Sequence, residues 1–183
     1  MHDNNDKKKA LLLALAKWAE CELFCIITFI FYAVVSSAMG KAAHLIFGLI
    51  CLILTVCIMA DFSLKLGYSA VKGVKAKTLS PCRNFGIFLG IFAALPTYIC
   101  YIFLLLSANG IIGNFFPAFK LINSMFAPLV NVFAVTADAR TLSVSQLVGI
   151  GALPLVIPTV CFFCFKLGYD DTDLAQKFIY KNK

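Results

Sequence analysis

The sequence predicts an all-α integral membrane protein whose four transmembrane helices form two parallel-related hairpins. Hydrophobic residues make up 61% of the 183-residue chain and charged residues only 14%, which is more apolar than a water-soluble domain. The apolar residues form continuous runs of about 20, which suit spanning helices rather than the alternating strands of a β-barrel. The tetrapeptide Lys-Leu-Gly-Tyr occurs twice, at residues 65–68 and 166–169, and two apolar runs precede each copy. We therefore expect one membrane domain, residues 1–183.

The amino-terminal segment, residues 1–22, predicts a cytoplasmic stretch that ends in a helix at the membrane interface. Its basic start precedes a leucine- and alanine-rich run, and Trp18 suits headgroup depth. The first span follows at residues 23–39, with Glu20 and Glu22 near the positive end of its helix dipole. A cleaved signal peptide is the alternative, and the two glutamates disfavour it.

The next elements complete the first hairpin. Gly40 leaves only a tight connection, so the second span, residues 42–60, must return antiparallel beside the first. Residues 61–84 predict a basic cytoplasmic loop, in which Pro81 interrupts any helix. We interpret the first Lys-Leu-Gly-Tyr as the exit of this span, with Gly67 ending the helix and the lysine and tyrosine anchoring it at the interface.

The third span, residues 85–106, begins the second hairpin. Gly86 and Gly90 lie four residues apart on it and form a candidate helix-packing face, since small residues let helices approach closely. Pro96 lies near its middle and is a candidate hinge.

The fourth span, residues 144–165, contains two further candidate hinges. Pro154 and Pro158 leave backbone carbonyls without partners, so a kink or a local opening is expected there. The second Lys-Leu-Gly-Tyr then leads into a cytoplasmic tail, residues 166–183, with acidic residues first and lysines last, as expected of a surface helix.

Residues 107–143 separate these two spans and predict an outer segment. Over residues 115–135, apolar and polar residues alternate at helical spacing, which indicates an amphipathic helix interrupted by Pro128. It either lies flat over the outer end or enters the membrane as a re-entrant segment. We favour the flat arrangement, because Lys120 and two asparagines resist burial. The candidate lid residues are Phe119, Phe126, Asn123 and Asn131.

The basic residues predict which way the chain faces. Thirteen of the 16 lysine and arginine residues fall in the amino-terminal segment, the central loop and the tail, and only Lys41, Lys120 and Arg140 fall on the other side. This bias places both termini in the cytoplasm and requires an even number of crossings. It also explains the net charge of +7, so no nucleic-acid partner is expected. The candidate partner-contact residues are Lys65, Lys72, Lys75, Lys77 and Arg83.

The eight cysteines raise the question of thiol chemistry. Cys161 and Cys164 have the Cys-x-x-Cys spacing of thiol oxidoreductases and metal sites. In this respect the chain resembles the small four-helix, quinone-linked membrane thiol oxidoreductases, but that class uses partner cysteines in an outer loop and this chain has none there. Membrane thiol redox chemistry is therefore a remote alternative. Packing by small apolar side chains is the ordinary explanation, and no structural disulfide is expected on the cytoplasmic side.

No other catalytic pattern emerges. His2 and His44 are the only histidines, and neither a metalloprotease motif nor a glycine-rich phosphate loop occurs. We expect no enzymatic activity, no metal and no cofactor. None of the predicted spans carries an ionisable residue at its centre, which disfavours an ion-coupled carrier.

Two functions from different classes remain. We expect a non-catalytic membrane subunit that docks a partner membrane protein through its helices, its central loop and its tail. The alternative is an oligomeric channel or transporter for a small or apolar solute, with Pro96, Pro154 and Pro158 along the pathway. Both involve contact with the lipid bilayer and either a homo-oligomer or a membrane partner. The expected location is a bacterial plasma membrane, because no organelle address is recognised.

Overall fold

A computed structural model of the protein describes residues 2–80, 82–134 and 136–170, where all regular structure is helical. The first half consists of a hairpin, α1 (His2–Met39) and α2 (Lys41–Lys75), joined at Gly40, which has a φ of 54°. The remaining elements are α3 (Phe85–Ala108), α4 (Phe116–Ile122), α5 (Ala127–Phe133), the 3₁₀ turn η1 (Ala139–Thr141), α6 (Val144–Ala152), the 3₁₀ turn η2 (Leu153–Leu155) and α7 (Val156–Tyr169). The surface helix predicted in the tail lies outside the described residues.

Three helices in the described residues are long and apolar enough to cross a membrane. They are Ala42–Lys75, Phe85–Ala108 and Val144–Tyr169. Large apolar side chains such as Phe31, Ile53 and Phe88 are exposed on their outer faces and on α1, which fits contact with lipid. The chain thus has the properties of a multi-pass helical membrane protein. The first predicted span, residues 23–39, is not among the three, so a four-span arrangement stays a prediction.

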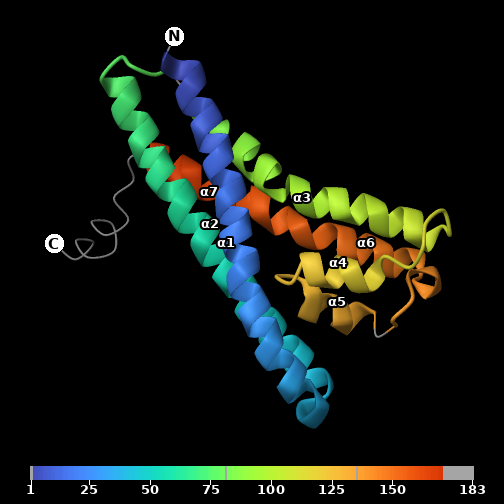
Figure 1. Ribbon diagram of the computed structural model, residues 1–183. Helices are drawn as coiled ribbons and strands as arrows, with labels where there is room; N and C mark the ends of the chain where they lie inside the picture. Colours follow the sequence, from blue (N-terminus) through green and yellow to red (C-terminus); the bar gives the residue numbers. More distant parts are fainter. Residues whose placement is uncertain (1, 81, 135, 171–183) are drawn as a thin grey trace.

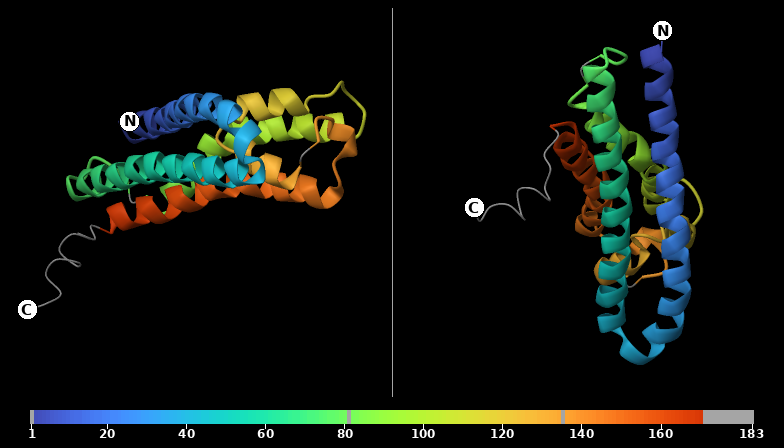
Figure 2. Two further views of the ribbon diagram at one scale, coloured as in Figure 1. Left: turned by 90° about the horizontal axis from the view of Figure 1, so that it is seen from below. Right: turned by 90° about the vertical axis from the view of Figure 1, so that its left-hand side faces the viewer.

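The two halves form two arms that meet at one end and diverge at the other. Figure 1 shows the α1–α2 hairpin as one arm and α3 with α6 and α7 as the second arm, with α4 and α5 in the space between them. At the joined end, α2 packs against α7 and α1 against α3 (Figures 1 and 2). In the second arm, the 3₁₀ turn η2 at Pro154 lies between α6 and α7, so this helix is not regular over its whole length.

The structure corrects the first half in two places. The stretch predicted as a separate interfacial helix is the first part of the continuous helix α1, and its small residues Ala10 and Ala14 are buried. Trp18 does not mark the headgroup level of a surface helix, because its Nε1 donates to Thr97 Oγ1 in the middle of α3, at 3.1 Å. An apolar face along α1 therefore packs against α3 instead of lying on the membrane.

The predicted loop of residues 61–84 is also wrong over most of its length. α2 continues to Lys75, and only residues 76–84 connect it to α3. Gly67 lies inside α2 and does not end it. The reason is tertiary, since a Cβ at Gly67 would lie 2.4 Å from the backbone oxygen of Phe165 in α7. The absence of a side chain allows this close approach.

Residues 115–135 do not form one amphipathic helix. They form α4 and α5, which are separated by a turn of residues 123–126, hereafter the 123–126 turn. Pro128 does not interrupt a helix, because it occupies the first turn of α5, where its missing N–H costs no helical hydrogen bond. Asn123 was expected to resist burial, but its side chain is completely buried, and so is that of the neighbouring Ser124.

The elements α4 and α5 lie in the space between the two arms, and whether this segment is flat or re-entrant in the membrane stays a prediction. The 123–126 turn enters the space between the two arms and reaches α1, as the hydrogen bonds described below show. Lys120 tolerates its half-buried position because its Nζ donates to the backbone oxygen of Thr136 at 3.3 Å and lies 4.0 Å from the centre of the Phe116 ring. Burial lowers the pKa of the Lys120 ammonium group. Because α4 leads into the fork between the arms and α5 leads back out of it, we call residues 116–133 the re-entrant segment, for this path alone.

Candidate functional site

The most unusual side chain of the described structure is the carboxylate of Glu22. Glu22 lies halfway along α1, and only 6% of the residue is exposed. The helix places it beside Cys21 and Cys25, which belong to the face of α1 that is turned toward the other helices. The two other charged side chains nearby on α1 have a simpler explanation, because Lys17 Nζ and Glu20 Oε2 form a partly exposed ion pair at 2.5 Å. Glu22 is left as a buried carboxylate.

The 123–126 turn binds one oxygen of this carboxylate. Ser124 Oγ donates to Glu22 Oε2 at 2.6 Å, and the backbone N–H of Met125 donates to the same oxygen at 3.3 Å. The turn presents these donors because Phe126 N–H and Ala127 N–H both bond back to the Asn123 carbonyl at 3.1 Å. Glu22 thus joins α1 to the connection between α4 and α5, 102 residues away in the chain.

The second oxygen of the carboxylate has no such partner. Glu22 Oε1 is buried without a hydrogen bond, and so are Asn123 Oδ1 and Thr55 Oγ1. The Cys100 thiol lies beside the Asn123 side chain, and the Cys25 thiol beside that of Thr55; Glu22 acts electrostatically on both thiols. These groups form one polar cluster in the fork between the arms, hereafter the Glu22 cluster. Two of its acceptor oxygens, Glu22 Oε1 and Asn123 Oδ1, receive no hydrogen bond.

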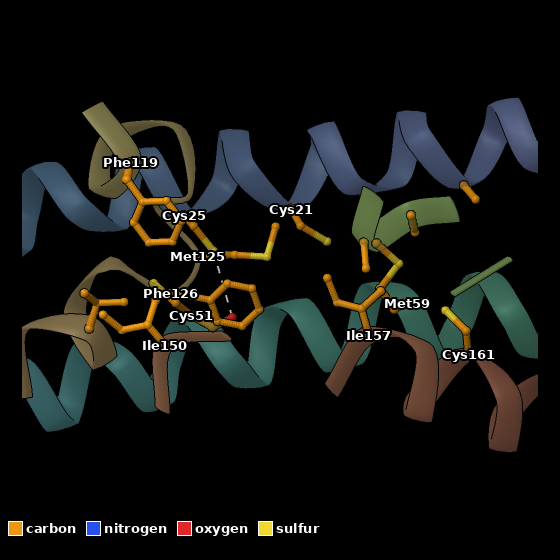
Figure 3. Packing of buried hydrophobic residues seen from close by; sticks show 14 of the residues in the cluster. Cys21, Cys25, Cys51, Met59, Phe119, Met125, Phe126, Ile150, Ile157 and Cys161 are labelled. Atoms are coloured by element: carbon orange, nitrogen blue, oxygen red, sulfur yellow. Dashed lines mark hydrogen bonds between the residues drawn. The ribbon is translucent and has the colours of Figure 1, made fainter. Parts of the chain in front are cut away.

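Apolar and sulfur-containing side chains surround the Glu22 cluster. Figure 3 shows Met125 and Phe126 in the space between α1 and α2, close to Cys25 and Cys51. All four residues are buried, and the Cys25 Sγ lies 3.9 Å from the Cys51 backbone oxygen. The carboxylate therefore sits in an environment that excludes water and offers little solvation for a charge.

A second polar contact ties α5 to the first hairpin. Asn131 Nδ2 donates to the Tyr32 hydroxyl at 3.0 Å, and the same hydroxyl forms a short hydrogen bond with His44 Nδ1. Gly48 of α2 allows Leu129 of α5 to approach, since a Cβ there would lie 2.6 Å from Leu129 Cδ2. The α4–α5 segment is thus held to the first hairpin at two levels, the 123–126 turn and α5.

The predicted lid residues are brought together, but in a different place. Phe119, Asn123 and Phe126 are buried at or beside the 123–126 turn, and Asn131 is half-buried against Tyr32. They form the contact between the re-entrant segment and the arms, and the structure does not place them as an outer cover. Side chains of both predicted faces are buried at this contact, Asn123 from the polar face and Phe126 from the apolar one, whereas Ile122 and Phe133 are exposed.

The predicted packing and hinge residues lie in a separate contact, between α3 and α7. A Cβ at Gly90 would lie 2.3 Å from the Cα of Pro158, and one at Gly86 would lie 2.8 Å from the backbone oxygen of Cys161. Pro96 lies within α3 and Pro154 in η2. None of these residues hydrogen-bonds to Glu22 in the described structure, so they do not form a common site with it.

The predicted partner-contact residues lie at the joined end of the arms. Lys65 pairs with Asp61 and Arg83 with Asp170, each at 2.7 Å, and both pairs are exposed. Lys72, Lys75 and Lys77 are exposed near the carboxyl end of α2. A cavity of about 350 Å³ at the same end is lined by residues from α1, α2 and α3, among them Lys7, Leu66 and Phe85.

The cysteine pair gains no support as a redox centre. Cys161 is completely buried against Gly86 and Gly90, and Cys164 is half-buried on the following turn of α7. Both thiols lack the exposed, electropositive surroundings that activate a cysteine. Among the described residues, no group of three or more histidine, cysteine, aspartate or glutamate side chains could hold a metal ion.

Glu22 was predicted as a helix-end residue, and its role was missed. The available signal was the pairing pattern: Lys17 and Glu20 lie three residues apart and can neutralise each other, which leaves Glu22 alone in an apolar run. The contact with Ser124 had no sequence signal, because it depends on the re-entrant path of α4 and α5. No protein-family model matches the sequence, and no curated protein or solved structure is similar to it.

Proposed function

We propose that this protein is a small membrane transport protein and that Glu22 binds and releases its coupling ion or substrate. The observation that supports this proposal is the buried carboxylate with one unpartnered oxygen, held at the turn of a re-entrant segment between two helical arms. The proposal replaces our expectation from the uncharged predicted spans, which rested on placing Glu22 at a helix end.

Burial of this carboxylate lowers the stability of the fold. Burying an ionised side chain without a counter-charge costs several kcal/mol, and an intramembrane acid is retained mostly where transport or proton transfer uses it. No lysine or arginine is among the groups that act on Glu22 in the described structure. A stable packing role would be served better by an apolar side chain of similar size.

The architecture offers a second argument. Non-helical backbone at membrane depth is tolerated only where protein or water covers it, and in transporters such broken helices commonly form the binding site between two related halves. Here the 123–126 turn is buried and lies between the two arms. Movement of this small segment relative to the arms would change access to Glu22 without unfolding a long helix.

Reconstituted protein tests the proposal directly. Purified protein in liposomes should move protons or small cations down an imposed gradient, as followed by a dye trapped inside, and Glu22→Gln should reduce the flux at least about tenfold. The matched control is Glu20→Gln, since Glu20 is two residues away but is partly exposed and paired with Lys17. Equal flux through wild type and Glu22→Gln would contradict the proposal.

A membrane-subunit role is the second candidate, and one observation favours it. The cavity at the joined end lies beside exposed basic side chains, an arrangement that suits contact with a partner on that side. Affinity purification from native membranes distinguishes the two functions. No flux from the protein alone, together with one stoichiometric partner released by charge reversal at Lys72 and Lys77, would favour the subunit. A homo-oligomer stays a prediction under both functions.

A further inference from the structure

We infer that the ion bound at Glu22 is a proton, and that this proton keeps the 123–126 turn docked between the two arms. The inference rests on the proposed transport function and deepens it, because it names the ion and the moving part. It rests on the hydrogen bonds that the Glu22 cluster makes and lacks, and on the position of the turn between the arms.

The site lacks a hydrogen-bond partner for one of the two carboxylate oxygens. Glu22 Oε2 already accepts hydrogen bonds from Ser124 and Met125, whereas Glu22 Oε1 has none. The nearby Asn123 Oδ1 is also an acceptor without a donor. A proton on Oε1 removes the buried charge and gives this oxygen a hydrogen to donate. The protonated carboxyl group keeps the two hydrogen bonds that Oε2 already accepts.

The donor set of the cluster does not suit a hard metal cation. Hard cations such as Mg²⁺ and Ca²⁺ take about six or more oxygen ligands. The unpartnered oxygens of the cluster come from Glu22, Asn123 and Thr55 only, and its other polar neighbours are thiols, which hard cations disfavour. The cluster therefore suits a proton better than a hard metal cation, and among the described residues no group of three or more histidine, cysteine, aspartate or glutamate side chains could hold a metal ion of another kind.

The groups around Glu22 offer no positive charge to balance an ionised carboxylate. The titratable groups that face Glu22 are all thiols, namely Cys21 and Cys25 on α1, Cys51 on α2 and Cys100 on α3. The turn contributes uncharged donors, among them the Ser124 hydroxyl and the Met125 amide. None of these groups supplies positive charge, so loss of the proton leaves an uncompensated buried carboxylate. Hydration of that carboxylate then favours release of the turn.

The negative charge of the deprotonated carboxylate determines how docking of the turn depends on pH. At acidic pH Glu22 is protonated and the turn is docked; at alkaline pH the proton passes to water that enters the fork, and the turn is released. The proton is the only species exchanged in this step. Coupling to a solute would follow if the released state exposes the fork between the arms.

Native cysteines serve as reporters of the movement. Cys25 and Cys51 are completely buried next to Met125 and Phe126, whereas Cys161 is completely buried in the separate contact between α3 and α7. Purified protein in liposomes is alkylated with N-ethylmaleimide over a series of pH values, and each site is quantified by mass spectrometry. The ratio of Cys25 to Cys161 modification corrects for the general increase of thiol reactivity with pH.

In wild-type protein, this ratio should rise at least about tenfold from acidic to alkaline pH, the size expected for a two-state shift in the turn. In Glu22→Gln it should stay low at every pH, because the neutral amide resembles the protonated acid. Glu20→Gln should behave like wild type. An equal rise in wild type and Glu22→Gln would overturn the inference.

A second measurement needs no substitution. An apolar carbodiimide reacts with protonated carboxyl groups and should label Glu22 in preference to Glu20 in wild-type protein, with more label at acidic pH. Labelling of Glu20 without Glu22 would overturn the inference. If both pH tests succeed but the liposomes show no flux, the proton site stands and the transport function fails. Flux with pH-independent Cys25 modification would overturn the proton-controlled turn and leave the transport function in place.

Discussion

The Glu22 carboxylate and the 123–126 turn stabilise each other through buried hydrogen bonds, and Ser124 Oγ also lies 3.2 Å from the Glu22 backbone oxygen. The turn needs acceptors for its buried Ser124 hydroxyl and Met125 N–H, and Glu22 Oε2 supplies them. In return, the carboxylate gains two of the few hydrogen bonds open to it in an apolar fork. A hydrogen bond to a charged or acidic group contributes about 1.5–3 kcal/mol, and an orphaned buried partner costs a similar amount.

Substitution of Ser124 tests this reciprocity. Ser124→Ala should lower the free energy of unfolding by roughly 1–3 kcal/mol, because it leaves Glu22 Oε2 with only the longer bond from Met125 N–H. Thermal unfolding in detergent measures the loss. Ser145→Ala is the matched control, since Ser145 is exposed at the start of α6 and should change the stability by no more than about 0.5 kcal/mol. Similar effects of the two substitutions would show that Ser124 does not contribute through Glu22.

Between whole elements, one of the closest contacts joins the two Lys-Leu-Gly-Tyr copies. A Cβ at Gly67 would lie 2.4 Å from the Phe165 oxygen, and a Cβ at Gly168 would lie 2.3 Å from the Leu64 oxygen. Each glycine thus faces the carbonyl three residues before the other glycine, so α2 and α7 cross with local twofold symmetry. The repeated sequence forms one reciprocal crossing between the arms.

This crossing predicts large effects from small side chains. Gly67→Ala and Gly168→Ala should each destabilise the protein by about 1–3 kcal/mol, because the added methyl group meets backbone, which cannot move aside like a flexible side chain. Unfolding in a denaturant series measures the effect. Gly113→Ala is the control, because a Cβ there has open space. A neutral Gly168→Ala would mean that the helices cross less closely than described.

The sequence allowed prediction of the elements better than of their contacts. The long apolar runs predicted α3 and the start of α6, and the repeat drew attention to Gly67 and Gly168. The amino-acid sequence alone could not show whether Gly67 ends a helix or permits two helices to cross closely, since glycine serves both purposes. It also assigned Asn123 to a solvated face by helical periodicity, which fails once a turn replaces the helix. The Glu22 cluster depends on that turn and was missed with it.

At the scale of the whole molecule, the two arms and the charge distribution are consistent with each other. The start of α1, the end of α2, the start of α3 and the end of α7 lie together, as the contacts of Lys7 with Ser80 and of Arg83 with Asp170 show. Basic residues are concentrated at this joined end. Lys120 and Arg140 lie away from it, with the elements between the arms. The positive-inside rule therefore predicts that the joined end faces the cytoplasm and that the re-entrant segment enters from the opposite side.

Reporter fusions test this topology, including the first span. Tags at the amino terminus, after residue 75 and after residue 183 should all be cytoplasmic, whereas tags at residues 40, 113 and 140 should lie outside. Residue 40 decides whether the α1–α2 hairpin crosses the bilayer, because a hairpin resting on the membrane would keep its connection on the cytoplasmic side. Residues 113 and 140 decide the re-entrant path, because α4 and α5 must enter and leave on one side. If the tags at 113 and 140 lie on opposite sides, the segment between them crosses the bilayer, and Glu22 cannot meet Ser124 within a re-entrant turn.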